Sequence, residues 1–339
     1  MTVQIGVIGC GMMGLDHVRT LTAAVSGAGV AAVFDADEER AARAASAAGG
    51  ARVHTDPVEL VRDAGVDAVV VASPDQTHEE FAMACVEAGK PVLCEKPLAT
   101  TSEACWRVVE AEMCGGRRLV QVGYMRRFDP AYLEMKRVFD SGEIGDALML
   151  HSVHRNVDYP PSLPASALVT ATGVHDIDIA RWLLREEIVS ATVHTPRPSG
   201  RVRPDFQDPQ FLVLQTEGGV LIDVEIFVNA QYGYDVRGEL VGERGSVSLV
   251  PPAAVSTRRA GMEGQAVAPD FRPRFQDAYR AELQAWVDAC AVGETCGASA
   301  WDGYTSAAVA EACLRSLSSG RTAPVEVKPR PTLYTESAT

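Results

Sequence analysis

Two short motifs in the N-terminal part of the chain have the side chains and the spacing of a redox site. Residues 9–14, Gly-Cys-Gly-Met-Met-Gly, follow an apolar run over residues 3–8, and residues 95–97, Glu-Lys-Pro, follow another apolar run. The first motif has the spacing of a tight turn that brings a helix N-terminus to the pyrophosphate of a dinucleotide. The second would place the ammonium of Lys96 at the carboxyl ends of the same parallel strands, where ligands of such sheets bind. Together the motifs predict an oxidoreductase that uses a nicotinamide cofactor.

The surroundings of the glycine motif favour NAD over NADP. A helix predicted to begin near Met12 offers free backbone N–H groups to phosphate. A second apolar run ends in Asp35, about 20 residues beyond the turn, where a carboxylate accepts hydrogen bonds from the adenosine ribose hydroxyls and repels a 2′-phosphate. The next arginine, Arg40, lies a turn into the following helix, and the competing interpretation is a glycine-rich turn that binds nothing. The cofactor contacts predicted from this region are Gly9, Gly11, Met12, Met13, Gly14 and Asp35.

Composition limits the class of protein and its partners. The chain has 339 residues, which is long for one hydrophobic core, so two domains are expected. The net charge of −14 argues against nucleic acid and anionic membranes as partners, because both would repel the protein. The eight cysteines form no C-x-x-C pair and no regular framework, which predicts reduced thiols, and no metal site is predicted. The chain has no uninterrupted apolar stretch of about 18 residues, and its first predicted strand leaves no room for a signal peptide, so a cytoplasmic location is expected.

The order of predicted elements indicates an α/β protein with two different sheets. Strands and helices alternate at first, which predicts a Rossmann domain over residues 1–123 with a doubly wound parallel sheet. Beyond it, strands rich in β-branched residues predict an α+β domain over residues 124–330 with a large, mostly antiparallel open sheet, followed by a tail over residues 331–339. The strand over residues 220–228 is apolar on both faces, so we expect a second subunit to cover this sheet, in a homodimer or homotetramer. In the second domain the other predicted elements are strands over 147–154, 211–216, 234–241 and 246–250, helices over 130–140, 275–292 and 301–318, and a loop over 251–273.

Residues 173–178, Gly-Val-His-Asp-Ile-Asp, contain a candidate base for alcohol oxidation. When a secondary alcohol transfers a hydride to nicotinamide, its hydroxyl proton must go to a base. His175 can accept that proton because imidazole titrates near neutral pH, and Asp178, three residues further along a helix, could orient the ring. Lys96 would donate a hydrogen bond to the reacting oxygen and stabilise the negative charge that develops there. Candidates for contacts with substrate hydroxyls are Asn156, Arg127 and Tyr279.

Each of these candidates has a structural alternative. His175 could be a satisfied core residue, and Lys96 could be a solvated strand end. The two arginines at positions 126–127 would more often form a surface pair, and Tyr279 could pack in the core. Asp176 is expected to serve the helix N-terminus, where negative charge is favourable.

Five motifs, in order along nearly the whole chain, resemble those of the Gfo/Idh/MocA oxidoreductases. They are residues 9–14, 73–78 (Ser-Pro-Asp-Gln-Thr-His), 95–97, 124–129 (Tyr-Met-Arg-Arg-Phe-Asp) and 173–178. Within that family, residues 125–129 and 151–156 (His-Ser-Val-His-Arg-Asn) are most similar to the inositol 2-dehydrogenases. The resemblance implies an NAD-dependent oxidation of a cyclic polyol, such as myo-inositol or a sugar, to a ketone. It also implies cofactor contacts from Ser73, Pro74, His78, Glu95 and Lys96.

One position departs from the family pattern. Inositol dehydrogenases resemble one another in having an aspartate four residues before the histidine, whereas this chain has Ala171 there. Three explanations stay open: a different natural substrate, compensation by Asp178 or a nearby threonine, and an engineered removal. Two other functions also stay open, namely an NAD-dependent glycosidase of the same superfamily and a non-catalytic relative that binds the cofactor.

Overall fold

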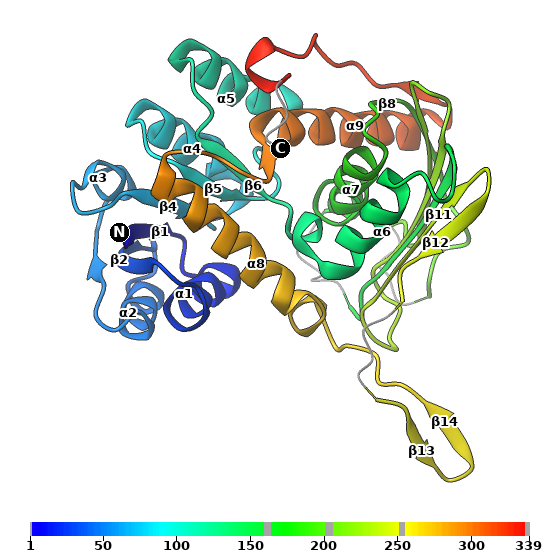
Figure 1. Cartoon of the computed structure of the whole chain (residues 1–339), viewed down its shortest axis with the longest axis horizontal. Coiled ribbons are helices and arrows are strands. Elements are labelled where there is room, and N and C mark those ends of the chain that lie inside the picture. Colours follow the sequence, from blue (N-terminus) through cyan, green and yellow to red (C-terminus); the bar gives the residue numbers. More distant parts are fainter. Residues whose placement is uncertain (1, 159–163, 201–205, 251–254, 336–339) are drawn as a thin grey trace. The chain divides into compact units, whose positions relative to one another are not determined.

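The structure is a computed structural model that describes residues 2–158, 164–200, 206–250 and 255–335. The described chain forms two compact units, whose elements are labelled in Figure 1: the first contains residues up to 125, residues 277–307 and those from 327 onward, and the second contains residues 126–276 and 308–326. The late segments belong to the first unit because β15 (Ala298–Ser299) pairs with its sheet and α8 (Phe271–Val292) contributes Leu283, Trp286 and Val287 to its core. This division departs from the predicted continuous domain over residues 124–330.

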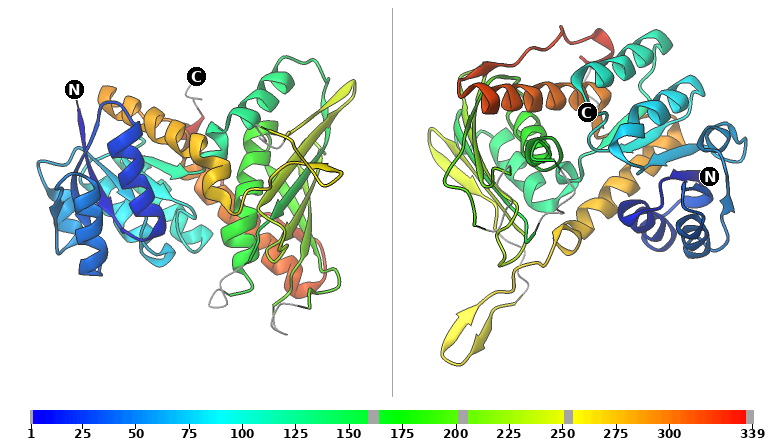
Figure 2. Two further views of the ribbon diagram at one scale, coloured as in Figure 1. Left: turned by 90° about the horizontal axis from the view of Figure 1, so that it is seen from below. Right: turned by 180° about the vertical axis from the view of Figure 1, so that it is seen from behind.

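The sheet of the first unit has the strand order of a dinucleotide-binding fold. The order is β15-β6-β5-β4-β1-β2-β3, in which β1 to β6 are parallel and β15 is antiparallel to β6. All four residues of β4 are buried, as expected for a central parallel strand with helices on both faces of the sheet. The predicted Rossmann fold is therefore confirmed (Figure 2). Its other elements are β1 (Val3–Ile8), α1 (Met12–Ala24), β2 (Ala28–Phe34), α2 (Glu38–Ala47), β3 (Arg52–Val53), α3 (Pro57–Arg62), β4 (Ala68–Val71), η1 (Asp75–Thr77), α4 (His78–Glu87), β5 (Val92–Glu95), α5 (Ser102–Gly115), β6 (Val120–Gly123) and η4 (Thr332–Tyr334).

The register of this sheet brings the candidate cofactor residues to one edge. Ile8 at the end of β1 pairs with Phe34 at the end of β2 and with Val71 at the end of β4. In the same way, Glu95 ends β5 beside Gly123 of β6. The segments that follow these strands, which carry the glycine turn, Asp35, Ser73 and Lys96, therefore all begin at the carboxyl edge of the sheet.

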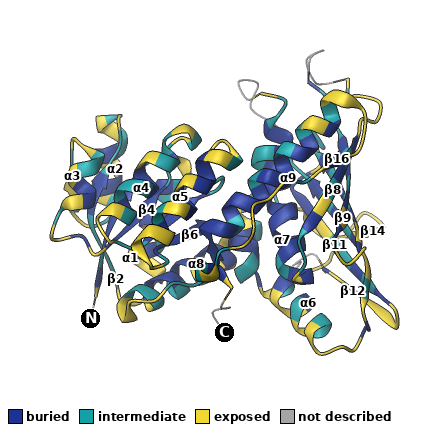
Figure 3. Ribbon diagram, turned by 90° about the horizontal axis from the view of Figure 1, so that it is seen from above, coloured by how far each residue is buried: buried dark blue, intermediate teal, exposed yellow. Residues whose placement is uncertain are grey.

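The second unit contains a mixed sheet with the order β12-β11-β7-β10-β9-β8-β16. Within this second sheet, β7 and β10 form the one parallel pair among the described strands and the other pairs are antiparallel, so the prediction of a mostly antiparallel sheet is confirmed. Helix α7 is buried along almost its whole length (Figure 3) and contacts β7. The sequence prediction omitted β8. The elements of this unit are η2 (Met125–Phe128), α6 (Pro130–Asp140), β7 (Ala147–Arg155), the π-helix η3 (Leu168–Gly173), α7 (Val174–Leu184), β8 (Ile188–His194), β9 (Gln210–Thr216), β10 (Leu221–Phe227), β11 (Asp235–Gly242), β12 (Gly245–Ser248), β13 (Thr257–Arg259), β14 (Met262–Gly264), α9 (Ala300–Ser319), which is shared with the first unit, and β16 (Ala323–Pro324).

Strand β10 has one buried face, and its other face is partly exposed. Ile222, Val224 and Ile226 are fully buried, whereas the alternating residues Asp223 and Glu225 lie on the other face and are only partly buried. The prediction that this strand is apolar on both faces at several positions fits its two ends, because Leu221 and Phe227 lie on the outer face with Asp223 and Glu225 between them.

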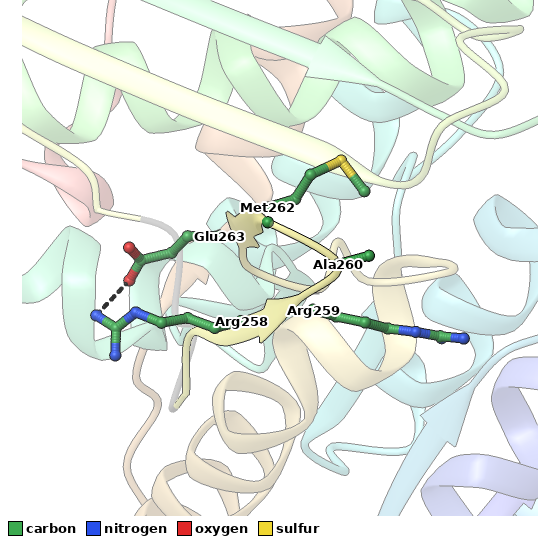
Figure 4. Close-up of a pocket in the computed structure, with 6 residues that line it drawn as sticks. Arg258, Arg259, Ala260, Met262 and Glu263 are labelled. Atoms are coloured by element: carbon green, nitrogen blue, oxygen red, sulfur yellow. Dashed lines mark hydrogen bonds and ion pairs between the residues drawn. The ribbon is translucent and has the colours of Figure 1, made fainter.

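A short hairpin replaces part of the loop predicted over residues 251–273. Strands β13 and β14 pair antiparallel, and their side chains are exposed. Arg258 and Glu263 are directly opposite each other and form an ion pair at 2.9 Å, which Figure 4 shows across the hairpin. Among the helices that the structure describes, none combines the length and the apolar character needed to cross a membrane.

Candidate active site

The glycine turn between β1 and α1 has the shape that a bound pyrophosphate requires. Gly9 has a positive φ of 89°, and a Cβ atom there would lie 2.5 Å from the backbone nitrogen of Ser73. A Cβ atom on Gly14 would lie 1.8 Å from the carbonyl oxygen of Gly9, so α1 packs against the turn more closely than any side chain allows. In contrast, no atom lies within 4 Å of a Cβ atom built on Gly11, which leaves room for a ligand to approach the backbone. Since no side chain caps α1, the N–H groups at its start, including those of Met12 and Met13, are suited to bind phosphate.

Asp35 lies directly beyond β2 and is held by hydrogen bonds from both sides. Its carboxylate accepts from the backbone N–H of Cys10 at 2.7 Å and from that of Asp37 at 2.8 Å. The Arg40 guanidinium also donates to it, through Nε at 3.0 Å and Nη2 at 2.7 Å. Burial raises the pKa of Asp35, but the hydrogen bonds from Arg40, Asp37 and Cys10 outweigh burial and hold the pKa below its usual range. From its distance along the chain, Arg40 was not expected to lie near the ribose site, whereas the first turn of α2 places its guanidinium against Asp35.

The segment after β4 forms a turn that is closed by its own side chains. Thr77 Oγ1 donates to the carbonyl oxygen of Pro74 at 2.8 Å, so the hydroxyl of Ser73, 2.7 Å from Thr77 Oγ1, must be the donor in their contact. His78 is 1% exposed, and both of its ring nitrogens face backbone carbonyl oxygens, those of Ser73 and Pro97. The cofactor contacts predicted for Ser73, Pro74 and His78 stay predictions.

Glu95 ends β5 and is buried directly before Lys96. Its Oε1 lies 2.8 Å from Nε2 of His17 in α1, and its Oε2 lies 3.3 Å from the backbone nitrogen of Lys96. Burial raises the pKa of Glu95, but His17, Lys96 and His78 outweigh burial and lower it. Glu95 therefore links the dinucleotide helix to the strand that carries Lys96. Lys96 itself is half-buried and precedes a cis peptide bond to Pro97.

A buried charged cluster supports the second unit around α7. Arg126 is 1% exposed and donates from Nη1 to Asp176 at 2.6 Å. Nδ1 of His154 lies 2.8 Å from the other oxygen of Asp176, and Nε2 of His154 lies 3.3 Å from the Tyr234 hydroxyl. Burial raises the pKa of Asp176, but Arg126 and His154 outweigh burial and keep it below its usual range. The expected surface position of Arg126 was therefore wrong, and Asp176, although in the first turn of α7, uses its carboxylate for this cluster.

His175 and Asp178 occupy the same helix but have different neighbours. His175 is largely buried, and its ring centroid lies 6.3 Å from that of His154. Asp178 is buried and accepts two hydrogen bonds from Arg127, from Nε at 2.9 Å and from Nη2 at 2.6 Å. Both oxygens of Asp178 thus bind a guanidinium, so Arg127, predicted as a substrate contact, also holds this helix. The orienting role of Asp178 toward His175 stays a prediction.

The other predicted substrate contacts lie in different places. Asn156 follows β7, where its backbone N–H donates to Phe227, and its buried Oδ1 accepts no hydrogen bond from the described residues. Tyr279 belongs to the first unit, where its ring lies edge-on to that of His17 at 5.9 Å between centroids.

Ala171 lies within the π-helix that leads into α7. Such wide turns are rare and are frequent at functional sites. A Cβ atom on Gly173, two residues later, would lie 2.7 Å from Cδ1 of Ile226, so the turn packs closely on β10. Ala171 is half-buried in this turn, three residues before α7 begins.

Sequence reasoning missed four residues of these clusters: Arg40, His17, His154 and Tyr234. His154 could have been found, because strand alternation places it on the same face as Leu150 and Ser152, which are buried. No group of three or more His, Cys, Asp or Glu residues in the described part of the chain is arranged to hold a metal ion.

Two family models match the chain in succession. The model described as an oxidoreductase family with an NAD-binding Rossmann fold matches residues 3–124, and the model of the C-terminal alpha/beta domain of the same family matches residues 136–327. Inositol 2-dehydrogenase 2 of Saccharopolyspora erythraea is 76% identical over 334 residues, which are 98% of each chain. Inositol 2-dehydrogenase of Burkholderia cenocepacia is 47% identical over 335 residues, which are 98% of this chain and 99% of the relative. The crystal structure of myo-inositol dehydrogenase from Lactobacillus casei, in complex with NAD(H) and myo-inositol, matches with a TM-score of 0.95 and 37% identity, over 98% of this chain and 100% of that chain.

Proposed function

Because this chain belongs to the Gfo/Idh/MocA family of oxidoreductases and is an NAD-dependent polyol dehydrogenase, we propose that it oxidises one secondary alcohol of myo-inositol to a ketone. The similarity to inositol 2-dehydrogenase 2 of Saccharopolyspora erythraea along almost the whole chain is the observation that carries this substrate. The cofactor residues of the first unit fit the same reaction, since the turn at residues 9–14 leaves space at Gly11 and Asp35 presents a carboxylate.

The chain supplies the groups that hold the cofactor. Backbone N–H groups at the start of α1 would bind the pyrophosphate, and Asp35 would accept hydrogen bonds from the adenosine ribose. Bound NAD supplies the acceptor for the hydride that leaves the carbinol carbon. The guanidinium of Arg40 donates hydrogen bonds to Asp35 and lowers its pKa, so the carboxylate stays ionised and can accept hydrogen bonds from the ribose hydroxyls.

Two side chains would act on the reacting hydroxyl group, one on its oxygen and one on its proton. In the proposal, Lys96 donates a hydrogen bond to the reacting oxygen and stabilises the alkoxide character that develops as the hydride leaves. His175 accepts the hydroxyl proton, so that the alcohol loses one hydride and one proton and becomes a ketone. The Asp178 and Arg127 pair holds the helix that carries His175, and Arg127, Asn156 and Tyr279 would contact the remaining hydroxyl groups.

We also propose a homo-oligomer and a cytoplasmic location. The outer face of the second sheet has partly exposed apolar side chains on neighbouring strands, which supports a self-complementary contact. All eight cysteines are free thiols, which is typical of a reducing compartment.

The test is a panel of inositol isomers, aminoinositols and common pyranoses with NAD, followed at the absorbance band of NADH. We expect NADH to accumulate over many turnovers with myo-inositol. A glycosidase of the same superfamily would instead cleave a glycoside without accumulating NADH, and a non-catalytic relative would bind NAD without any turnover. Either result would contradict the proposal.

A Lys96→Ala variant tests the role of the ammonium in the same assay. We expect turnover to fall by about a hundredfold, the scale of losing one oriented donor, while the affinity for NAD changes little. Lys90→Ala is the matched control, because Lys90 precedes the same strand and its Nζ donates only to the backbone of Asp63 among the described contacts. If Lys96→Ala retains its turnover, Lys96 has no role in the reaction and is only the solvated residue that follows the strand.

A further inference from the structure

His78 lies between the two turns that follow β4 and β5. It is the first residue of α4 and is 1% exposed. Its Nδ1 lies 2.7 Å from the carbonyl oxygen of Pro97, and its Nε2 lies 2.8 Å from the carbonyl oxygen of Ser73. Both partners are acceptors only, so each contact needs a hydrogen on the ring nitrogen.

The two distances determine how many protons the ring carries. A neutral imidazole has one N–H, and its other nitrogen would turn a lone pair toward a carbonyl lone pair at hydrogen-bond distance, in a position buried from bulk solvent. Turning the ring over would put carbon atoms at these positions, whereas C–H···O contacts are found at about 3.3–3.6 Å. Only the imidazolium, with a hydrogen on each nitrogen, satisfies both carbonyl groups.

Both acidic and basic groups lie around His78, so some of them favour a positive charge on its ring and others disfavour it. Glu95 on β5 is buried, and His78 is one of the groups that lower the pKa of its carboxyl. Asp75 in η1 and Glu79 and Glu80 in the first turn of α4 add negative charge on the elements next to the ring. Opposing them are the ammonium of Lys96 and the N-terminal end of the α4 dipole. The buried carboxylate of Glu95 is the group that offsets a charge on His78 away from solvent.

We propose that His78 carries a hydrogen on both ring nitrogens and is a positioning residue that holds the turn carrying Lys96 against the turn carrying Ser73. Its two hydrogen bonds tie the backbone on the far side of the Lys96–Pro97 bond to the end of β4. Lys96 is thereby held in one position at the carboxyl edge of the sheet.

Neutron diffraction on deuterium-exchanged crystals of the unmodified protein measures the proton count directly. We expect deuterium on both Nδ1 and Nε2 of His78 at neutral pH. A single deuteron would overturn the proposal. This measurement does not depend on the substrate, so it stands whether or not the proposed function is correct.

A His78→Gln variant tests the positioning role, because the amide group can donate to one carbonyl but not to both. We expect faster backbone hydrogen exchange in peptides that cover residues 72–78 and 95–99. The matched control is His54→Gln, whose ring is half-buried in the same unit and contacts Asp63, and we expect it to leave both peptides unchanged. Unchanged exchange in His78→Gln would overturn the positioning role.

The consequence for catalysis rests on the proposed function. We expect kcat with myo-inositol to fall by about tenfold in His78→Gln, the effect of one lost hydrogen bond, while the Kd for NAD stays nearly constant. An unchanged kcat in His78→Gln would contradict the role of His78. If the parent oxidises no polyol at all, the proposed function fails, and the neutron and exchange results still decide the state and role of His78.

Discussion

Asp35 and Arg40 together form the part of the site that would read the adenosine ribose. The carboxylate is the group expected to select NAD, yet a guanidinium lies 2.7 Å from it. In the parent protein the arginine is engaged by the aspartate, so its charge is not free to bind a phosphate. Removal of the aspartate would release it.

We predict that the protein prefers NAD and that Asp35→Ser narrows or reverses this preference. The substitution removes the repulsion of a 2′-phosphate and frees Arg40 to pair with it. The ratio of kcat/KM for NADP to that for NAD should rise by about 10- to 100-fold, the factor that one charged hydrogen bond supplies. The double variant Asp35→Ser/Arg40→Gln should lose most of this gain. Equal kcat/KM of the parent with both cofactors would contradict the prediction.

Ala171 is the residue at which this chain departs from its family. If the substrate is an ordinary inositol, Ala171→Asp should add a carboxylate in the turn before α7 that supports His175 as a base. Turnover of myo-inositol should then rise by one or more orders of magnitude, since a positioned proton-transfer partner contributes about 10²–10⁴-fold. Ala171→Asn is the matched control, because it adds a side chain of the same size without the charge. An aspartate variant no faster than its parent on every inositol isomer would indicate a different polyol.

Among the elements, α7 depends most on buried charge. The helix is held by Arg126 through Asp176 and by Arg127 through Asp178, and all four side chains are largely removed from water. Breaking a buried ion pair leaves the remaining charge without compensation, which costs far more than losing a surface pair.

Asp176→Asn should therefore lower the free energy of unfolding of the second unit by about 3–5 kcal/mol. The pKa of Asp176 is lowered in the folded state, so its ion pair stabilises the fold above the unfolded-state pKa of about 3.9 and is lost as the pH falls through the lower folded-state pKa. The difference in the free energy of unfolding between the parent and Asp176→Asn should accordingly be constant near neutral pH and should become smaller in acid. Urea denaturation across this pH range measures it. Glu134→Gln, which breaks the exposed pair with Arg137, should cost less than about 1 kcal/mol. An equal loss in both variants would contradict the argument.

For the whole molecule, the outer face of the second sheet is the feature that predicts assembly. Val153 lies beside Glu225, which in turn is paired with Phe211, so apolar and charged side chains alternate across neighbouring strands. The ion pair of Arg155 with Glu225, with its shortest contact at 2.6 Å, lies on the same face. A surface with such alternating apolar and charged side chains can meet a copy of itself about a two-fold axis.

We predict a symmetric dimer, or a tetramer built from dimers, at micromolar concentration. Phe211→Glu should shift the protein toward monomer, because it adds a third carboxylate beside Glu225 and Asp223 in a face that association must dehydrate. Val53→Glu adds the same charge to an exposed strand of the first unit and should leave the mass unchanged. Light scattering distinguishes these outcomes, and a monomeric parent would refute the prediction.

Much of the first unit could be predicted from the sequence alone. Apolar runs, a glycine spacing and an acid at the end of the second run are local patterns, and parallel strands joined by helices bring their carboxyl ends to one edge in nearly any arrangement. For the same reason the positions of Gly9, Gly14, Asp35 and Lys96 relative to the strands agreed with expectation. The pairing of β15 with β6 joins residues far apart in sequence, so no local pattern predicts that this late segment extends the first sheet.

The sequence by itself therefore determined the cofactor fold, the succession of sheets and the residue types that could oxidise an alcohol. Only the tertiary structure decided which charges meet: Arg40 with Asp35, Arg126 with Asp176, and Arg127 with Asp178. It alone placed the ring of His78 between two backbone carbonyl groups. The physical reason is that periodicity and spacing report which face of an element is buried. The protonation and partners of a buried polar group depend on what the other elements bring to it.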